Sequence, residues 1–289
     1  MPIPLHESVE ACGKVILLGE HSVVYGHPAV AAGLPQGLCL RAAPRERPEL
    51  PITLVIPQWQ LALELRADSD HPVVCACLEV LTHCEGPLTG WALHGTTCLP
   101  ARAGLGSSAA LTVALARLVL GQDAPLDEVV AASMAGERVF HGEPSGLDSR
   151  VAAQGGVLRF VRGATTEPIP LAGPLPLVLI PSGIPRSTAV QVARVRARLE
   201  RNPAIIRPLL GALAASVDAG IARSPAPTSS PSARSSTSPT ACSARSTSRR
   251  PRSTPCKPRA SAPALAGPSS PGPAAAAVCS PSRPTTPAR

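Results

Sequence analysis

The sequence predicts an α+β protein of two lobes, the second of them incomplete. Segments typical of strands and of helices follow one another without strict alternation, which favours α+β over a parallel α/β sheet. A second unit is expected to begin near Pro174, and the composition changes sharply after Ala222. We therefore expect an N-terminal lobe over residues 1–165, the start of a C-terminal lobe over 166–222, and a disordered tail over 223–289.

Hydrophobic periodicity places the elements. Strands are expected where short apolar or alternating runs end at turn residues, at 15–18, 38–42, 52–56, 61–65, 91–94 and 157–161. Helices are expected over longer periodic runs, at 72–84, 107–120 and 127–141. In the second lobe the sequence predicts a strand at 177–180 and helices at 188–199 and 205–222.

The basic net charge belongs to the tail. Residues 1–222 contain 17 Lys and Arg against 19 Asp and Glu, whereas residues 223–289 contain 10 Lys and Arg and no acid. Aromatic residues that could stack on bases make up 2% of the chain. A nucleic-acid partner is therefore not expected.

Targeting signals and metal motifs are not evident. The N-terminus does not resemble a signal peptide, and no uninterrupted apolar stretch looks long enough to span a bilayer. This predicts a cytoplasmic protein without a membrane partner. The nine Cys are scattered without CxxC pairs, so we expect free or buried thiols and no zinc site.

A glycine-rich turn followed by two hydroxyls is the most informative local feature. Gly104 and Gly106 flank Leu105, and Ser107 and Ser108 then open a long apolar helix. Glycines let a ligand approach the backbone, and the first amides of a helix lack intrahelical partners. Such a turn can bind phosphate at the positive end of the helix dipole, although an ordinary capped core helix has a similar pattern.

Two further segments concentrate charged side chains. Lys14 begins a strand, and Glu20 and His21 follow across a glycine turn; Glu137 lies in a helix, and Asp148 follows after a Gly- and Pro-containing loop. The ordinary alternatives are a solvated edge lysine, a helix-face glutamate and a helix-capping aspartate. Together the segments offer what phosphoryl transfer needs, namely oxygen ligands for a metal, a phosphate cradle, a carboxylate and a cation.

These segments resemble the motifs of the GHMP kinases. Residues 13–26 (GKVILLGEHSVVYG) resemble the first motif of the family, and residues 100–110 resemble its second, phosphate-binding motif. The run HGEPSGLD at 141–148 and the run PRST at 185–188 are similar to the branch that phosphorylates mevalonate. The resemblance covers residues 10–222 and implies a two-lobed GHMP-kinase-like fold with a ferredoxin-like C-terminal lobe.

The resemblance also implies roles in an ATP- and Mg²⁺-dependent kinase. The ATP phosphates would be wrapped by Arg102, Ala103, Gly104, Leu105, Gly106, Ser107 and Ser108. Ser108 and Glu137 would hold Mg²⁺. Asp148 would accept the proton of the primary hydroxyl, and Lys14 would favour the charged carboxylate. The mevalonate pocket would be lined by Glu20, His21 and Thr188, and a homodimer is the assembly considered.

The sequence also departs from the family pattern. Arg102 stands where the family usually has Gly, and the third motif, a Gly-rich loop near the C-terminus, is missing. Three other interpretations stay open: another small-molecule kinase of the family such as phosphomevalonate kinase, an inactive truncated nucleotide-binding protein, and a non-catalytic protein whose basic tail grips an acidic surface.

A changed reading frame would account for the tail. Residues 223–289 contain 16 Ser and 14 Pro, and their only large aliphatic residues are Leu265 and Val278. Such a segment cannot bury enough apolar area to offset its ordering entropy. Read from their third bases, the codons of 267–279 permit AKLTGAGRGGCV, which resembles the missing third motif. We therefore expect a lost or gained base near codons 220–225.

Sequencing the gene across codons 220–225 tests this expectation. We expect a single-base insertion or deletion there, after which the other frame continues into the glycine-rich segment. An unbroken frame that encodes residues 223–289 as they stand would contradict it.

Overall fold

The described part of the chain is built on one seven-stranded sheet. A computed structural model describes residues 4–101, 103–180 and 188–223. The strand order is β4-β3-β5-β2-β6-β7, with β1 paired to β2. The strands are β1 (Ser8–Leu18), β2 (Ala29–Pro44), β3 (Ile52–Ile56), β4 (Leu61–Leu65), β5 (Trp91–Thr97), β6 (Val157–Phe160) and β7 (Glu167–Pro168). Only β3 and β5 pair in parallel among these strands, so the sheet is mixed.

The long strand β2 organises the sheet. Its residues 38–44 pair with β5, its residues 29–32 pair with β6, and β1 runs antiparallel along both parts. The sequence predicted only the central or final parts of β1 and β2, because their remaining residues include many Ala, Gly and polar residues with low strand propensity. The β1 register shifts on both sides of Lys14, and such irregularities re-aim side chains.

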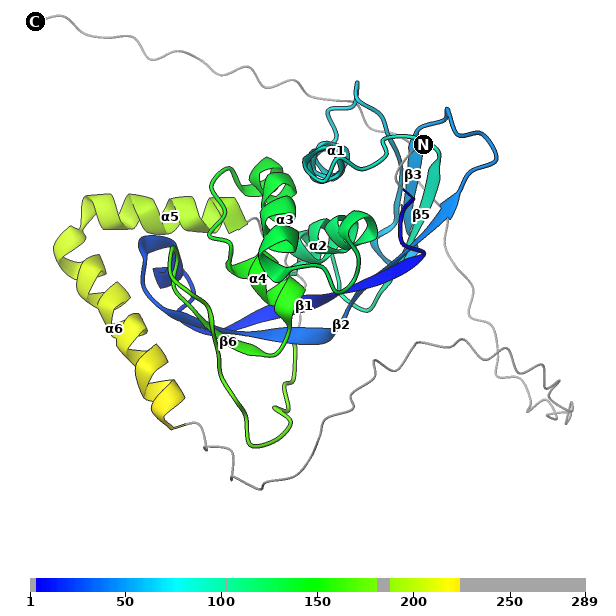
Figure 1. Ribbon diagram of the computed structural model, residues 1–289. Coiled ribbons are helices and arrows are strands. Elements are labelled where there is room, and N and C mark those ends of the chain that lie inside the picture. The colour runs from blue at the N-terminus through cyan, green and yellow to red at the C-terminus, as the bar shows by residue number, and fades with distance from the viewer. Residues whose placement is uncertain (1–3, 102, 181–187, 224–289) are drawn as a thin grey trace, which may run out of the picture. The chain divides into compact units, whose positions relative to one another are not determined.

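Four helices gather on one face of the sheet (Figure 1). They are α1 (Pro72–His83), α2 (Ser107–Leu120), α3 (Leu126–His141) and α4 (Leu147–Gln154). Helix α2 contacts β1, β2 and the other three helices, and its apolar residues are buried all round, as expected of a central helix. The largest buried side chains include Leu38, Leu40, Leu54, Leu111, Leu115 and Leu118.

Most predicted elements of the first lobe are confirmed. The bounds predicted for β3, β4 and α2 agree with the structure. Helix α4 was not predicted as a segment; Gly146 precedes it, and Asp148 lies inside its first turn instead of at its cap. Two short 3₁₀ helices, η1 (Ser22–Tyr25) and η2 (Pro57–Trp59), were also not predicted.

The strand predicted at 177–180 is wrong. These residues form no strand, and Val178 and Ile180 are 87% and 86% exposed. An isolated strand cannot satisfy its backbone groups, and the described residues provide no neighbour for this one. The predicted helices of the second lobe are present as α5 (Thr188–Arg201) and α6 (Pro203–Ala222). The proposed boundary between lobes stays a prediction.

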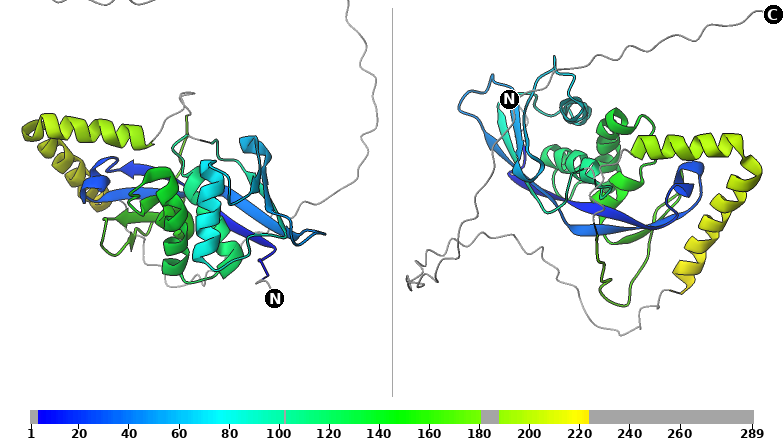
Figure 2. Two further views of the ribbon diagram at one scale, coloured as in Figure 1. Left: turned by 90° about the horizontal axis from the view of Figure 1, so that it is seen from above. Right: turned by 180° about the vertical axis from the view of Figure 1, so that it is seen from behind.

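Helix α6 has two apolar faces. It contacts β1, β2 and η1, and Figure 2 shows it from two further sides. Its Leu210 and Val217 are buried. Ile205, Leu209 and Leu213, spaced four apart on one stripe, are exposed.

By length and composition alone α6 is apolar enough to cross a membrane, although Arg207 and Asp218 interrupt its apolar sequence. Its contacts with the sheet indicate that α6 is part of the folded protein. The described residues do not cover the stripe formed by Ile205, Leu209 and Leu213, which we call the outer stripe of α6.

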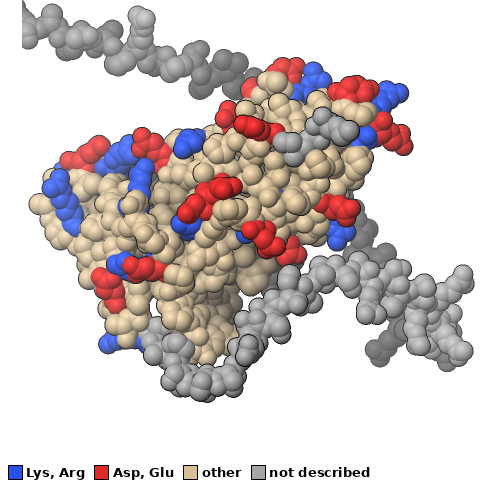
Figure 3. Space-filling model, viewed as in Figure 1, with Lys and Arg blue, Asp and Glu red and all other residues tan. Residues whose placement is uncertain are grey.

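Charged side chains do not form a single-sign patch on the face shown in Figure 3. Lys and Arg alternate with Asp and Glu over that face. This distribution agrees with the nearly balanced charge of residues 1–222.

The outer stripe of α6 should drive self-association. Replacing Ile205, Leu209 and Leu213 with Gln is expected to reduce aggregation without lowering the melting temperature, because these side chains are 62%, 55% and 41% exposed. Light scattering over a concentration series and a thermal melt measure the two effects. As a control, Leu210→Gln, at a position 5% exposed, should destabilise the fold by roughly 2–4 kcal/mol. Unchanged aggregation of the triple variant would contradict the prediction.

Candidate active site

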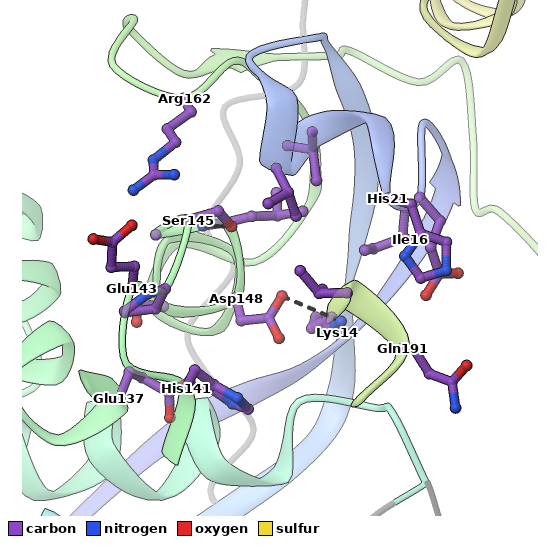
Figure 4. A pocket seen from close by; sticks show the side chains of 18 of the residues that line it. Lys14, Ile16, His21, Glu137, His141, Glu143, Ser145, Asp148, Arg162 and Gln191 are labelled. Carbon is purple, nitrogen blue, oxygen red and sulfur yellow. Dashed lines mark hydrogen bonds and ion pairs between the residues drawn. The ribbon is translucent and has the colours of Figure 1, made fainter. Parts of the chain in front are cut away.

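The ion pair between Lys14 and Asp148 lies at the centre of the site. Lys14 belongs to β1 and Asp148 to α4, and the lysine Nζ is 3.1 Å from Asp148 Oδ1 (Figure 4). The lysine side chain is 9% exposed and the aspartate side chain 31%. Lys14 is therefore not the solvated edge charge of the ordinary alternative, and the carboxylate stays accessible to a ligand.

The predicted phosphate turn packs directly onto Lys14. Gly104 and Gly106 have φ angles of +77° and +75°, in the left-handed region that favours glycine. A Cβ on Gly106 would lie 2.6 Å from Lys14 Cγ. The Lys14 backbone N–H donates to the Leu105 carbonyl at 2.9 Å. These contacts bring the N-terminus of α2 beside the ion pair; Ala103 lies in the same turn, and Arg102 lies outside the described residues.

Ser108 and Glu137 form a second, buried pair. Ser108 Oγ donates to Glu137 Oε2 at 3.4 Å, and Glu137 is 1% exposed. Its Oε1 is buried without a hydrogen-bond partner among the described residues. Burial, helped by the negative charge of Asp148, raises the pKa of Glu137 to about 8, although the Ser108 hydrogen bond and the charge of Lys14 oppose the rise.

The Ser108–Glu137 pair fits Mg²⁺. This cation prefers oxygen ligands, and it commonly takes only one or two carboxylates from the protein and the rest from phosphates and water. The pair supplies a hydroxyl and a carboxylate with an unused oxygen. The described residues contain no group of three or more His, Cys, Asp or Glu placed to hold a metal. The donor set therefore suits a cation that binds together with phosphates.

His141 faces the same carboxylate from one turn further along α3. Its Nε2 is 3.6 Å from Glu137 Oε2, and its Nδ1 is buried without a partner in the described part of the chain. Burial lowers the pKa of His141, against the charge of Asp148. The imidazole is thus neutral at neutral pH and does not compensate the charge of an ionised Glu137.

A cavity of about 420 Å³ opens beside the ion pair. Glu20 and His21 line it, and their role toward a substrate stays a prediction. Thr188 is the first residue of α5, and other residues of that helix line the cavity. Residues 103–108, the described part of the phosphate turn, do not line the cavity. Ser108 is connected to it through its hydrogen bond to Glu137, which does line the cavity.

Several cavity residues were not assigned a role from the sequence. They are His141, Glu143, Ser145, Arg162, Gln191 and Arg196. Figure 4 shows Arg162 and Glu143 on one side of Asp148, with His21 and Gln191 on the other. The cavity is therefore walled by segments from both ends of the described chain.

Only one of these residues has a clear local signal in the sequence. The Ser145 hydroxyl accepts a hydrogen bond from the Leu147 backbone N–H two residues further on, a local turn that serine commonly forms. Arg162 and Arg196 have no comparable signal, because they reach the cavity only through the placement of the segment after β6 and of α5.

Comparison with known proteins identifies the class of protein. Residues 72–156, which include α2, α3 and Asp148, match the model for the GHMP kinases N terminal domain. Over these residues the chain is similar to the N-terminal domain of the GHMP kinases. It is similar to the mevalonate kinase of Bos taurus, 34% identical over 261 residues, and to that of Pyrococcus horikoshii, 32% identical over 224 residues.

These matches cover 70% and 72% of this chain, and the chain spans 65% and 66% of the two relatives. Among solved structures, the L. major mevalonate kinase in complex with R-mevalonate has a TM-score of 0.59 at 24% identity, covering 77% of this chain and 70% of that one. The Methanococcus jannaschii mevalonate kinase has a TM-score of 0.57 at 21% identity, covering 75% and 73%. These likenesses confirm the GHMP-kinase-like α+β fold.

Glu137 should make the free energy of unfolding depend on pH when no metal is present. Its pKa is about 8 in the folded chain against an ordinary value of 4.5, so the folded state keeps a proton that the unfolded state releases. Stability is therefore expected to fall as the pH rises from about 4.5 to about 8. Glu137→Gln should flatten this slope and exceed the parent's stability above about pH 8 by a few kcal/mol. Urea melts from about pH 5 to 9 measure the slopes, and parallel slopes would contradict the assignment.

Proposed function

We propose that this chain is a kinase that transfers the γ-phosphoryl group of ATP to the primary hydroxyl of mevalonate. The products are 5-phosphomevalonate and ADP. The observation that carries the proposal is the Lys14–Asp148 pair at 3.1 Å, open to a cavity on one side and flanked by the Ser108–Glu137 pair. The similarity to mevalonate kinases at 30–34% identity supports this substrate.

The ion pair suits the alcohol half of the reaction. As the hydroxyl oxygen forms its bond to the γ-phosphorus, Asp148 takes the hydroxyl proton, and the bond from phosphorus to the bridging oxygen breaks to release ADP. Lys14 stabilises the negative charge that develops on the attacking oxygen and on the transferring group. Its burial makes this charge effect stronger than it would be in water.

The cavity lining suits the rest of the substrate. Mevalonate carries a carboxylate, a methyl group and a second hydroxyl. Arg162 and Arg196 line the cavity and can pair with the carboxylate. Ile16 and Val24 offer apolar contact to the methyl group, and His21 can hydrogen-bond a hydroxyl.

The second pair and the glycine turn suit the nucleotide half. Ser108 and Glu137 would hold Mg²⁺, which when bound neutralises phosphate charge. The turn at 103–108 presents free backbone N–H groups at the start of α2 to the phosphates. Because burial disfavours the ionised form of Glu137, a bound cation is also what this carboxylate needs to carry its charge.

We also infer that residues 223–289 stand in place of the rest of the C-terminal lobe. Val178, Ile180 and the outer stripe of α6 are exposed apolar groups that such a lobe would cover. The chain spans 65% of the bovine relative. As written, the chain is expected to bind nucleotide with weak or no turnover, and the frame-restored chain is expected to be an active cytoplasmic enzyme.

A coupled ATPase assay with mevalonate tests the function on both chains. The frame-restored chain should turn over mevalonate and leave phosphomevalonate unphosphorylated. Asp148→Asn should lower its kcat by about 10²–10⁴-fold, because the proton acceptor is lost while the shape is kept. Retained activity in that variant would remove the proposed base. Equal activity of the two chains would refute the role given to the missing segment.

A further inference from the structure

Three buried hydroxyls connect the helices that carry the site. Thr112 of α2, Ser133 of α3 and Ser149 of α4 are 0%, 0% and 1% exposed. Thr112 Oγ1 is 2.8 Å from Ser133 Oγ, and Ser133 Oγ donates to Ser149 Oγ at 2.9 Å. We call these three residues the hydroxyl chain. Because an unpaired buried hydroxyl is costly, these bonds fix the three helices relative to one another.

On α2 and α3 the hydroxyl chain lies one helical turn from the metal-binding pair. Thr112 follows Ser108 by four residues, and Ser133 precedes Glu137 by four residues. Residues four apart lie on the same face of a helix. Thr112 Oγ1 also lies 3.2 Å from the carbonyl oxygens of Ser108 and Ala109, but its single proton goes to the shorter 2.8 Å bond with Ser133 Oγ.

The third member lies beside the proposed base. Ser149 is the residue after Asp148, in the first turn of α4. Among the described residues Asp148 makes no hydrogen bond to Ser108 or Glu137, so their spacing must be set by the helices beneath them.

The hydroxyl chain is the fully buried polar connection that reaches all three helices. Other polar contacts join them in pairs: Arg117 of α2 donates to the Ala153 carbonyl of α4, and Arg150 of α4 pairs with the exposed Asp127 of α3.

Proton counting gives the hydroxyl chain a direction. Each hydroxyl has one proton. The Ser133 proton goes to Ser149, so the bond between Thr112 and Ser133 uses the Thr112 proton. There is little room for a replacement donor, since a Cβ on Gly136 would already lie 2.7 Å from Thr112 Cγ2 and 2.8 Å from the Ala76 carbonyl. Without the Thr112 hydroxyl, Ser133 loses its donor from α2.

We propose that Thr112, Ser133 and Ser149 are positioning residues that set the spacing between the metal-binding pair and the base Asp148. This inference rests on the proposed function, because it assigns the spacing to a Mg²⁺-nucleotide on one side and an alcohol on the other. Misplacing either partner by about 1 Å is enough to cost about 10²-fold in rate.

The matched pair Thr112→Val and Thr112→Ser tests the proposal on the full chain. Valine keeps the shape and removes the hydroxyl, whereas serine keeps the hydroxyl and removes a buried methyl. Calorimetry with ATP at saturating Mg²⁺ and with ATP plus a chelator measures nucleotide binding, and a thermal melt measures stability. Thr112→Val is expected to weaken Mg²⁺-dependent ATP binding about tenfold. Thr112→Ser should bind within about twofold of the parent, although the lost methyl lowers its melting temperature by a few degrees.

The outcomes separate the inference from the function on which it rests. Two outcomes overturn the positioning role alone. In the first, the ATP affinities of the two variants fall in proportion to their melting temperatures. In the second, Thr112→Val and the parent bind ATP equally in the presence of Mg²⁺. A parent chain that binds no Mg²⁺-ATP overturns the proposed function and this inference with it. If Thr112→Val does not fold, Ser149→Ala removes only the last acceptor of the hydroxyl chain and is expected to show the same Mg²⁺-dependent loss; unchanged binding there overturns the proposal.

Discussion

The close packing of a glycine turn against a buried lysine is the constraint on which the site depends. Lys14 can meet Asp148 only if its aliphatic stem passes under the turn, and the stem leaves no space for a side chain on Gly106. The same contact fixes where α2 begins, because the Lys14 backbone N–H is bonded to Leu105. This one steric fit therefore brings the Lys14 ammonium group, the free backbone amides at the start of α2 and the Ser108 hydroxyl close together.

The electrostatics of the site follow from this packing. Glu137 is buried beside Asp148, so its ionised form is disfavoured, and neither Ser108 nor neutral His141 compensates that charge. Lys14 is already engaged with Asp148. In the proposed function, a divalent cation carried by phosphates would compensate the charge of Glu137. Under the proposed function, nucleotide binding would therefore be coupled to the ionisation of Glu137.

The sequence predicts those parts of the structure whose signals are local. The alternation at 61–65 and the apolar run at 107–120 end at turn residues, and both elements were found with the expected bounds. The convergence of Lys14 with Asp148, and of Ser108 with Glu137, could be predicted because motifs in order along the chain imply a shared site. Arg162 could not be predicted, because it reaches the cavity only through the placement of the segment after β6. The hydroxyl chain could not be predicted either, because a buried Ser or Thr among Ala and Val looks like an ordinary interior helix position, and tertiary packing determines its hydrogen-bond partners.

The distribution of exposed apolar groups shows which part of the chain has a complete core. Nine of the eleven exposed large hydrophobic residues in the described ranges lie between Leu175 and Leu213. The part of the chain before Leu175, in which the helices and the sheet bury one another, contains all four central residues of the site: Lys14, Ser108, Glu137 and Asp148. Under the proposed function, phosphate and metal binding would therefore need no more of the second lobe than its first helices. In the proposed enzyme a full second lobe would add cover over the cavity, and excluding water directs a phosphoryl group to an alcohol instead of to hydrolysis. An incomplete lobe should therefore impair the transfer step more than the binding of nucleotide.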